Sequence, residues 1–161
     1  MHSPSWLHLP ASTTSPSTDE LQTLLAHAQA LQHGPAQVLQ GKRLALMCAD
    51  AHSQEAQLFL QAARELGVHV SLLPASTAHC RPEELPEIGA MLGRLYDAVE
   101  WQGVSADAVC QLAAASGIPM FTALAGQQHR LFSLAKNWEA GLPLAERHRR
   151  LIQAALVMTL I

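Results

Sequence analysis

The residues RLALMCADAHSQEAQLFLQAARELGVHVSLL, numbers 43–73, hold the pattern that decides the fold. Residues 43–48 are apolar and bounded by polar residues, as expected of a buried strand. From about Ser53, apolar side chains recur at helical intervals until Gly67, and residues 68–73 form a second apolar run. Two apolar runs joined by a helix predict parallel strands with a helical crossover.

The same alternation continues on both sides of this stretch. Ahead of it, the spacing of Ser17 and Glu20 fits a capping box, which opens an amphipathic helix that ends at Gly34-Pro35. Beyond it, we predict helices over 85–96, 105–117 and 142–161 and strands over 97–101 and 118–121. The last helix is apolar on nearly every side near its end, so it must be buried. The pattern predicts an α/β fold, a four-stranded parallel sheet with helices on both faces, and leaves the strand order open.

Composition excludes several classes of protein. The chain has 161 residues, of which 49% are hydrophobic and 14% charged, and this fits a single domain. Its formal charge of -3 argues against nucleic acid as a partner. There is no apolar run of membrane-spanning length and no secretory leader pattern, so we expect neither a membrane segment nor export. Cys48, Cys80 and Cys110 are widely spaced, which predicts reduced thiols in a cytoplasmic protein, with Cys48 and Cys110 on buried faces.

Histidine and arginine are the residues that could suggest further binding sites. The chain has nine histidines but no HxxxH pair and no Cys/His quartet, so we expect no metal and no other cofactor. Arg147, Arg149 and Arg150 fall within one and a half helical turns. This spacing is more typical of a solvated helix face than of an anion site.

Several segments, taken in chain order, resemble the carbamoyl-phosphate-binding domain of the ornithine and aspartate carbamoyltransferases. They are Ser5-Trp-Leu-His-Leu9, Leu39-Gln-Gly-Lys-Arg-Leu-Ala-Leu46, Leu92-Gly-Arg-Leu-Tyr-Asp97, Leu112-Ala113 with Gly117-Ile-Pro119, and Glu146 to Leu160, which is similar to the family's C-terminal helix. In the family, that helix follows a second domain, which binds the amino acid. Here Lys136-Asn-Trp-Glu-Ala-Gly141 stands where the second domain would be. The resemblance implies a carbamoyltransferase N-terminal domain that keeps its returning helix and lacks the amino-acid domain.

On this reading the chain divides into three parts. Residues 1–18 form an N-terminal segment and a connector rich in Ser, Thr and Pro. Residues 19–136 form the carbamoyl-phosphate-binding-like domain. Residues 137–161 form a linker and the returning helix, which packs on the same domain.

The resemblance also points to a ligand crevice. The segment His52-Ser-Gln-Glu-Ala56 stands where the family has Ser-Thr-Arg-Thr-Arg around the phosphate, and Gln102 replaces a further arginine. His129 keeps the histidine of the family's His-Pro-x-Gln, although a structural hydrogen bond would explain it equally well. The candidate crevice residues are His52, Ser53, Gln54, Glu55, Gln102 and His129, none of them catalytic. Residues 49–56 carry a net charge of -2, from Asp50 and Glu55, where the family is positive.

The absence of the family's phosphate-binding arginines determines which function we expect. If each charged hydrogen bond contributes roughly 1.5–3 kcal/mol, losing two or three removes on the order of 3–9 kcal/mol. The whole binding free energy of a ligand with a micromolar dissociation constant is only about 8.2 kcal/mol. We therefore expect a degenerate, non-catalytic domain with a binding or regulatory role. The alternative is a residual small-molecule or amino-acid-binding protein that uses the old phosphate crevice.

Expected partners follow from the way the family assembles through this domain. A homo-oligomer is predicted, with the family's trimer ahead of a two-fold dimer. A full-length carbamoyltransferase is the other partner that the resemblance implies. The low charged fraction supports assembly independently, because it leaves more neutral surface than a monomer of this size would expose.

Overall fold

The sheet is the centre of the molecule. A computed structural model describes residues 5–7, 15–34 and 37–161, and within them four parallel strands pair in the order β2-β1-β3-β4. The strands are β1 (Arg43–Cys48), β2 (His69–Pro74), β3 (Ala98–Trp101) and β4 (Met120–Thr122). The predicted four-stranded parallel sheet is confirmed, and each strand lies within two residues of its predicted bounds.

The order of the strands determines where the crevice lies. The chain leaves β1 for β2 on one side of it and then crosses to β3 on the other side. Leu44 of β1 is accordingly in register with Val70 of β2 and with Ala98 of β3. The connections after β1 and β3 therefore diverge in opposite directions, and the carboxyl ends of these two strands border the position at which α/β proteins hold ligands.

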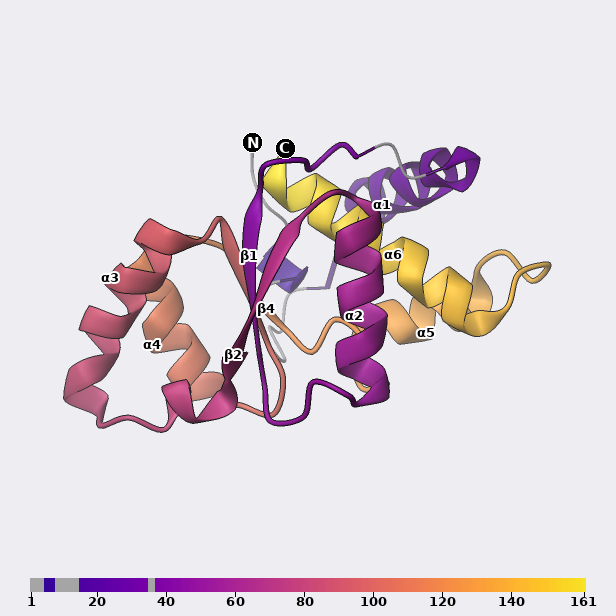
Figure 1. Cartoon of the computed structure of the whole chain (residues 1–161). Helices are drawn as coiled ribbons and strands as arrows, with labels where there is room; N and C mark the ends of the chain where they lie inside the picture. Colours follow the sequence, from indigo (N-terminus) through magenta and orange to yellow (C-terminus); the bar gives the residue numbers. More distant parts are fainter. Residues whose placement is uncertain (1–4, 8–14, 35–36) are drawn as a thin grey trace.

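Helices cover both faces of the sheet (Figure 1). One face carries α1 (Thr18–Ala30), α2 (Gln54–Glu65), α5 (Arg130–Asn137) and α6 (Leu144–Leu160), and the other carries α3 (Leu85–Leu95) and α4 (Ala106–Ser116). Alternate residues of β1 serve the two faces: Leu44 and Leu46 join the larger apolar cluster, and Ala45 and Met47 the smaller one. Short 3-10 helices occupy Ser5–Leu7, Leu31–His33, Ala75–Ala78 and Pro82–Glu84.

The first long helix begins where the capping box was predicted. The backbone N–H of Glu20 donates to Oγ of Ser17 at 3.2 Å, and the N–H of Ser17 donates to Oε2 of Glu20 at 2.8 Å. The expected connector ahead of it falls largely on residues 8–14, outside the described residues. Of the expected stop at Gly34-Pro35, Gly34 is the C-cap of the 3-10 helix Leu31–His33, with a φ of 113°, and Pro35 lies outside the described residues.

Helix α6 is the most deeply buried helix on its face of the sheet. Every residue from 151 to 157 is buried, which confirms the prediction from its apolar end. It packs against α1, α2 and α5. Its arginines are not a solvated face, and that prediction is wrong. The guanidinium of Arg147 donates to the carbonyl of Trp138 at 2.8 Å, while Arg149 pairs with Glu65 at 3.3 Å and Arg150 pairs with Glu146.

Two further details differ from expectation. Helix α5 was not predicted, although it supplies one wall of the site described below. All three cysteines are free, and Cys48 is buried as predicted, but Cys110 is exposed. Helix α4 turns Val109 and Leu112 inward, and Cys110 lies about 100° around the helix from Val109, so it points away from the core. No helix in the described part of the chain is long and apolar enough to cross a membrane.

Candidate functional site

The connection from β1 to α2 forms the first border of the crevice. Oγ of Ser53 accepts a hydrogen bond from the N–H of Ala56 at 3.1 Å, so this hydroxyl serves as the N-cap of α2. The N–H of His52 donates to Oδ1 of Asp50 at 2.8 Å, which shapes the turn, and His52 itself is exposed. Both residues therefore stabilise the loop. Neither the Ser53 hydroxyl nor the His52 ring forms a hydrogen bond to β3 among the described residues.

Glu55 lies in the first turn of α2 and is half-buried. Its carboxylate reaches toward the loop after β4, because a Cβ added to Gly126 would lie 3.6 Å from Oε1 of Glu55. A carboxylate at this position complements the positive end of the helix. Gln54, beside it, is exposed. The structure therefore places an acid at the helix N-terminus where the family resemblance implies a phosphate.

A buried acid lies behind Glu55. Glu100 on β3 is fully buried, and its Oε1 accepts a hydrogen bond from the N–H of Leu124 at 2.9 Å. Burial raises the pKa of Glu100 to about 8, the negative charge of Glu55 adds to this, and the Leu124 N–H and the Gln102 side chain oppose it. Glu100 is thus protonated at neutral pH. Its Oε2 has no hydrogen-bond partner among the described residues.

Gln102 follows β3 and is buried. Its backbone N–H donates to the carbonyl of Met47 at 2.8 Å, which extends the β1–β3 pairing by one bond. Its side chain lies beside the Glu100 carboxyl and lowers the pKa of that group, although Nε2 forms no hydrogen bond of good geometry in the described part of the chain. Buried polar atoms without partners are uncommon, and they mark this end of β3 as a place where a polar molecule could bind.

Two histidines complete the crevice on the side of α5 and α6. Nδ1 of His129 accepts from the N–H of Leu131 at 3.2 Å, so His129 caps α5, and burial lowers its pKa to about 4, with smaller contributions from His148 and Arg130. Nε2 of His148 lies 2.9 Å from the carbonyl of Leu124, and burial lowers its pKa as well. Both rings are neutral at pH 7. The structural role that the sequence left open for His129 is the one observed.

Two hydrogen bonds to Leu124 fix the loop between β4 and α5. The N–H of Leu124 donates to Glu100, and the carbonyl of Leu124 lies within hydrogen-bond distance of the His148 ring. Ala123, just before it, has a φ of 50°, a conformation that alanine adopts only when its surroundings enforce it. Glu100 and His148 supply that enforcement, because they hold the peptide groups that follow Ala123.

A groove of about 960 Å³ opens beside Glu55, between α2, the loop after β4, α5 and the start of α6. Its lining consists of Gln54, Glu55, Gln57, Leu58, Leu60, Gln61, Arg64, Glu65, Ala125, Gln127, Phe132, Leu144, Ala145 and His148. The ring of Phe132 meets that of His148 edge to face, with centroids 5.4 Å apart. One end of the groove thus touches the crevice, and the other follows α2 toward its C-terminus.

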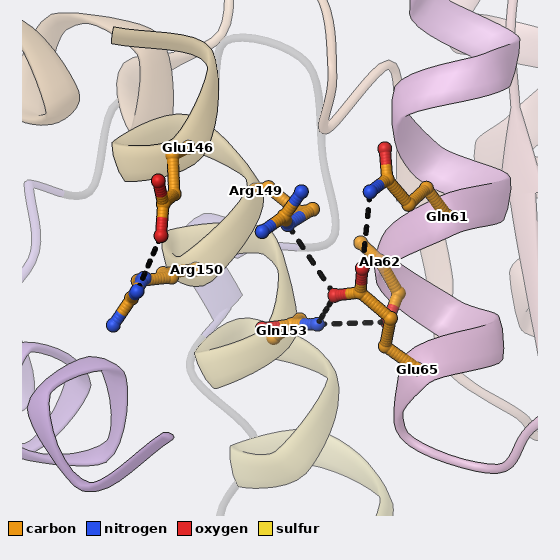
Figure 2. A network of polar contacts seen from close by, with 7 residues as sticks. All are labelled: Gln61, Ala62, Glu65, Glu146, Arg149, Arg150 and Gln153. Carbon is orange, nitrogen blue, oxygen red and sulfur yellow. Dashed lines mark hydrogen bonds and ion pairs between the residues drawn. The ribbon is translucent and has the colours of Figure 1, made fainter. Parts of the chain in front are cut away.

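The far end of the groove is closed by polar contacts between α2 and α6 (Figure 2). The carboxylate of Glu65 accepts from Gln61 at 3.0 Å and from Gln153 at 2.7 Å, and it pairs with Arg149 at 3.3 Å. Gln153 also donates to the carbonyl of Ala62 at 3.3 Å. Glu65 is therefore fully partnered, in contrast to Glu55 at the other end.

The predicted crevice residues fall into two groups. Glu55 and Gln102 converge on Glu100, and His129 lies near His148, so these side chains share one region. His52 and Ser53 shape the loop, and Gln54 borders the groove. No group of three or more His, Cys, Asp or Glu suited to a metal ion occurs among the described residues.

Sequence reasoning missed Glu100 and His148. One signal for Glu100 was available, since it is the single charged residue in the otherwise apolar strand 98–101. His148 gave no comparable signal, because it stands between arginines at the start of a helix. The six candidate residues include no arginine or lysine, and the charge nearest to Glu100 among them is the carboxylate of Glu55.

The fold and the crevice define an α/β protein with a parallel sheet and a ligand position at the ends of β1 and β3. No family model matches the chain. An ornithine carbamoyltransferase from Cutibacterium acnes is 33% identical to it over 125 residues, which cover 74% of this chain and 37% of that protein. An ornithine carbamoyltransferase from Actinobacillus pleuropneumoniae is 33% identical over 100 residues, 62% of this chain and 30% of that protein.

Solved structures show the same fold. The catalytic subunit of M. jannaschii aspartate transcarbamoylase has a TM-score of 0.62 at 22% identity and covers 81% of this chain and 44% of its own. Ornithine carbamoyltransferase from Pyrococcus furiosus has a TM-score of 0.60 at 23% identity, with 74% and 40% covered. The chain is therefore similar in sequence to ornithine carbamoyltransferases over part of their length, and it shares its fold with part of the ornithine and aspartate carbamoyltransferase structures. It spans about a third of the length of the curated relatives that it matches.

Proposed function

We propose that the chain is a non-catalytic carbamoyltransferase-like domain with a binding or regulatory role. The observation that carries this proposal is the pair of acids at the phosphate position, Glu55 at the start of α2 and the buried Glu100 behind it. An incoming phosphate would meet the Glu55 carboxylate and would find no arginine at positions 54, 55, 56 or 102. Phosphoryl and carbamoyl transfer both need cationic or N–H groups aimed at the developing charge, and this crevice lacks the cationic ones.

The connection between α5 and α6 supports the same proposal. Residues 138–143 join these two helices directly, and α5 and α6 pack against each other. No second domain is inserted at this point, where the family resemblance implies the domain that binds the amino acid. Without it, a second substrate has no residues to position it against a carbamoyl group.

A direct assay tests the proposal. Purified protein is incubated with carbamoyl phosphate and either ornithine or aspartate, and citrulline or carbamoyl-aspartate is measured. We expect no product above the rate in buffer. The ornithine carbamoyltransferase of Cutibacterium acnes, run in parallel, shows that the assay detects the reaction. Product formed by this chain alone at a rate above buffer would refute the proposal.

The alternative function is a small-molecule or amino-acid-binding protein that uses the old crevice. The buried Gln102 amide and Glu100 carboxyl favour it, because Nε2 and Oε2 form no hydrogen bond of good geometry among the described residues, so a polar ligand could provide one. A thermal-shift screen against carbamoyl phosphate, phosphate, amino acids and nucleotides distinguishes the two functions. A ligand at 100 times its dissociation constant stabilises the fold by about 2.7 kcal/mol, which such a screen detects.

We further propose that the chain forms a homo-oligomer, with the family's trimer ahead of a two-fold dimer, or joins a full-length carbamoyltransferase, and that it acts in the cytoplasm. Four large apolar side chains support an interface because each is 44–48% exposed: Val38, Leu72, Met91 and Leu95. Leu72 lies on β2, an edge strand whose outer side is open to pairing. The free thiols support a reducing compartment.

A further inference from the structure

The groove along α2 has a carboxylate at one end, that of Glu55 in the first turn of the helix. Glu55 lines it and forms no hydrogen bond or ion pair with any described residue. Of the lining residues that the structure describes, only Arg64 carries a positive charge, and nine helical residues place it roughly 13 Å from Glu55 along the axis of α2. Glu65, the other acid in the lining, is already paired with Arg149. The carboxylate at Glu55 is thus available to a ligand.

The groove around this carboxylate is shaped for a small organic molecule. Its volume of about 960 Å³ lies within the range of ligand pockets. Leu58, Phe132 and Leu144 contribute apolar side chains to its lining. The ammonium group of Lys136 already lies 4.7 Å from the centroid of the Phe132 ring, so this ring is suited to contact the apolar body of a ligand and not a second ammonium group.

The surroundings of Glu55 select the sign of the ligand's charge. Glu100 lies behind it on β3 but is buried and protonated at neutral pH, so the negative charge that an anion would meet is that of Glu55. His148 and His129, from α6 and α5, are neutral and add no positive charge. A cation at Glu55 gains an ion pair. A carboxylate on the same ligand would be repelled by Glu55, and Arg64, the one positively charged lining residue that the structure describes, lies roughly 13 Å away along α2.

We propose that this groove binds a primary amine with an apolar body, with the ammonium group on Glu55 and the body between Leu58, Phe132 and Leu144. The inference rests on the binding role proposed above and names the chemical class of the ligand. It disfavours free amino acids, because their carboxylate would lie beside the Glu55 carboxylate and be repelled by it. The site differs from the phosphate crevice in charge, although both border the N-terminus of α2.

Binding of three related probes tests the inference by isothermal titration calorimetry. The probes are 2-phenylethylamine, its neutral analogue 2-phenylethanol, and phenylalanine, which adds a carboxylate to the same amine. We expect the amine to bind at least tenfold more tightly than either of the others, and more weakly as salt is added. Equal affinity for the amine and the alcohol, or tighter binding of phenylalanine, overturns the inference.

Two variants locate the site. Glu55→Gln removes the charge and is expected to lower the affinity for 2-phenylethylamine at least tenfold, whereas Glu83→Gln, at an exposed acid outside the groove, leaves it unchanged. Leu58→Lys introduces an ammonium group into the groove and should abolish binding even if Glu55→Gln fails to fold. Unchanged affinity in Leu58→Lys would place the amine elsewhere and overturn the inference.

The results also separate this inference from the proposed function. Carbamoyl transfer together with amine binding at Glu55 would remove the non-catalytic proposal and leave the amine site standing. Absence of both transfer and amine binding would remove the amine site alone.

Discussion

Replacement of Glu100 by glutamine tests how the buried acid governs the stability of this fold. Glutamine has nearly the same volume and keeps a side-chain oxygen for the N–H of Leu124, which now donates to Oε1 of Glu100 at 2.9 Å. It cannot ionise. The pKa of Glu100 is about 8 in the folded chain against an ordinary value of 4.5. At pH 7 the folded chain therefore keeps a proton at this residue that the unfolded chain has lost.

The magnitude follows from this difference in bound protons. Between pH 4.5 and 8 the folded state binds one proton more than the unfolded state at Glu100, so the free energy of unfolding falls by about 1.4 kcal/mol for each pH unit. By pH 7 the free energy of unfolding has fallen by an amount on the order of 3 kcal/mol. Glu100→Gln removes this loss of stability, because glutamine does not titrate. We expect the variant and the original chain to be similar in stability near pH 4.5 and the variant to be more stable at pH 7, with a melting temperature about 6–12 °C higher.

Urea unfolding followed by circular dichroism at several pH values between 4.5 and 8 measures the difference. The histidines of the crevice titrate in both proteins, so their contributions cancel in the comparison. Glu83→Gln, at an exposed acid, serves as the matched control and should show no difference from the original chain at any pH. A gap between Glu100→Gln and the original chain that stays constant with pH would refute the reasoning, because it would show that Glu100 does not titrate differently in the folded state.

Three further changes test other parts of the site. His129→Asn keeps a good N-cap residue for α5 but removes the imidazole, whose pKa in the folded chain is about 4 against an ordinary 6.5. The variant should therefore lose less stability than the original chain as pH falls from 6.5 to 4. Melting temperatures at several pH values measure this difference. The triple variant Gln54→Arg, Glu55→Thr and Gln102→Arg restores positive charge at α2 and should raise phosphate affinity by about 100-fold in calorimetry, whereas no gain in a folded variant would contradict the residue correspondence at these loops. Light scattering should return a mass near three times 17.3 kDa, with twice that mass favouring the dimer and the single mass excluding self-assembly.

Local signals predicted most of the fold. The capping box at Ser17 and the apolar run of β1 are properties of neighbouring residues, and both appear where the sequence places them. The strand order could not be predicted, because it depends on which helices pack on which face of the sheet. Helix α5 was missed because it has eight residues and begins at a histidine, which is not among the preferred N-cap residues.

The site was less predictable, for a physical reason. The family resemblance placed Glu55 and Gln102 in one region, at loops that follow parallel strands, where ligands bind in α/β proteins. The hydrogen bonds of Glu100 and His148 go to the backbone of Leu124, 24 residues away from each. A backbone partner has no side-chain signature, so no pattern in the sequence reveals that these two residues fix the loop. They emerged only once the strands and helices were assembled.

The protonation of Glu100 follows from its burial, which has the largest effect on its pKa. The Gln102 side chain lowers that pKa, but too weakly to keep the carboxyl ionised at neutral pH. An arginine at this position, where the resemblance places one in the family, would favour the ionised carboxyl more strongly, because a guanidinium carries a full positive charge. A buried carboxyl without a cationic partner avoids the cost of an uncompensated charge by taking up a proton. The residue at position 102 therefore bears both on the ligand that we propose for the crevice and on the charge of the strand that supports it.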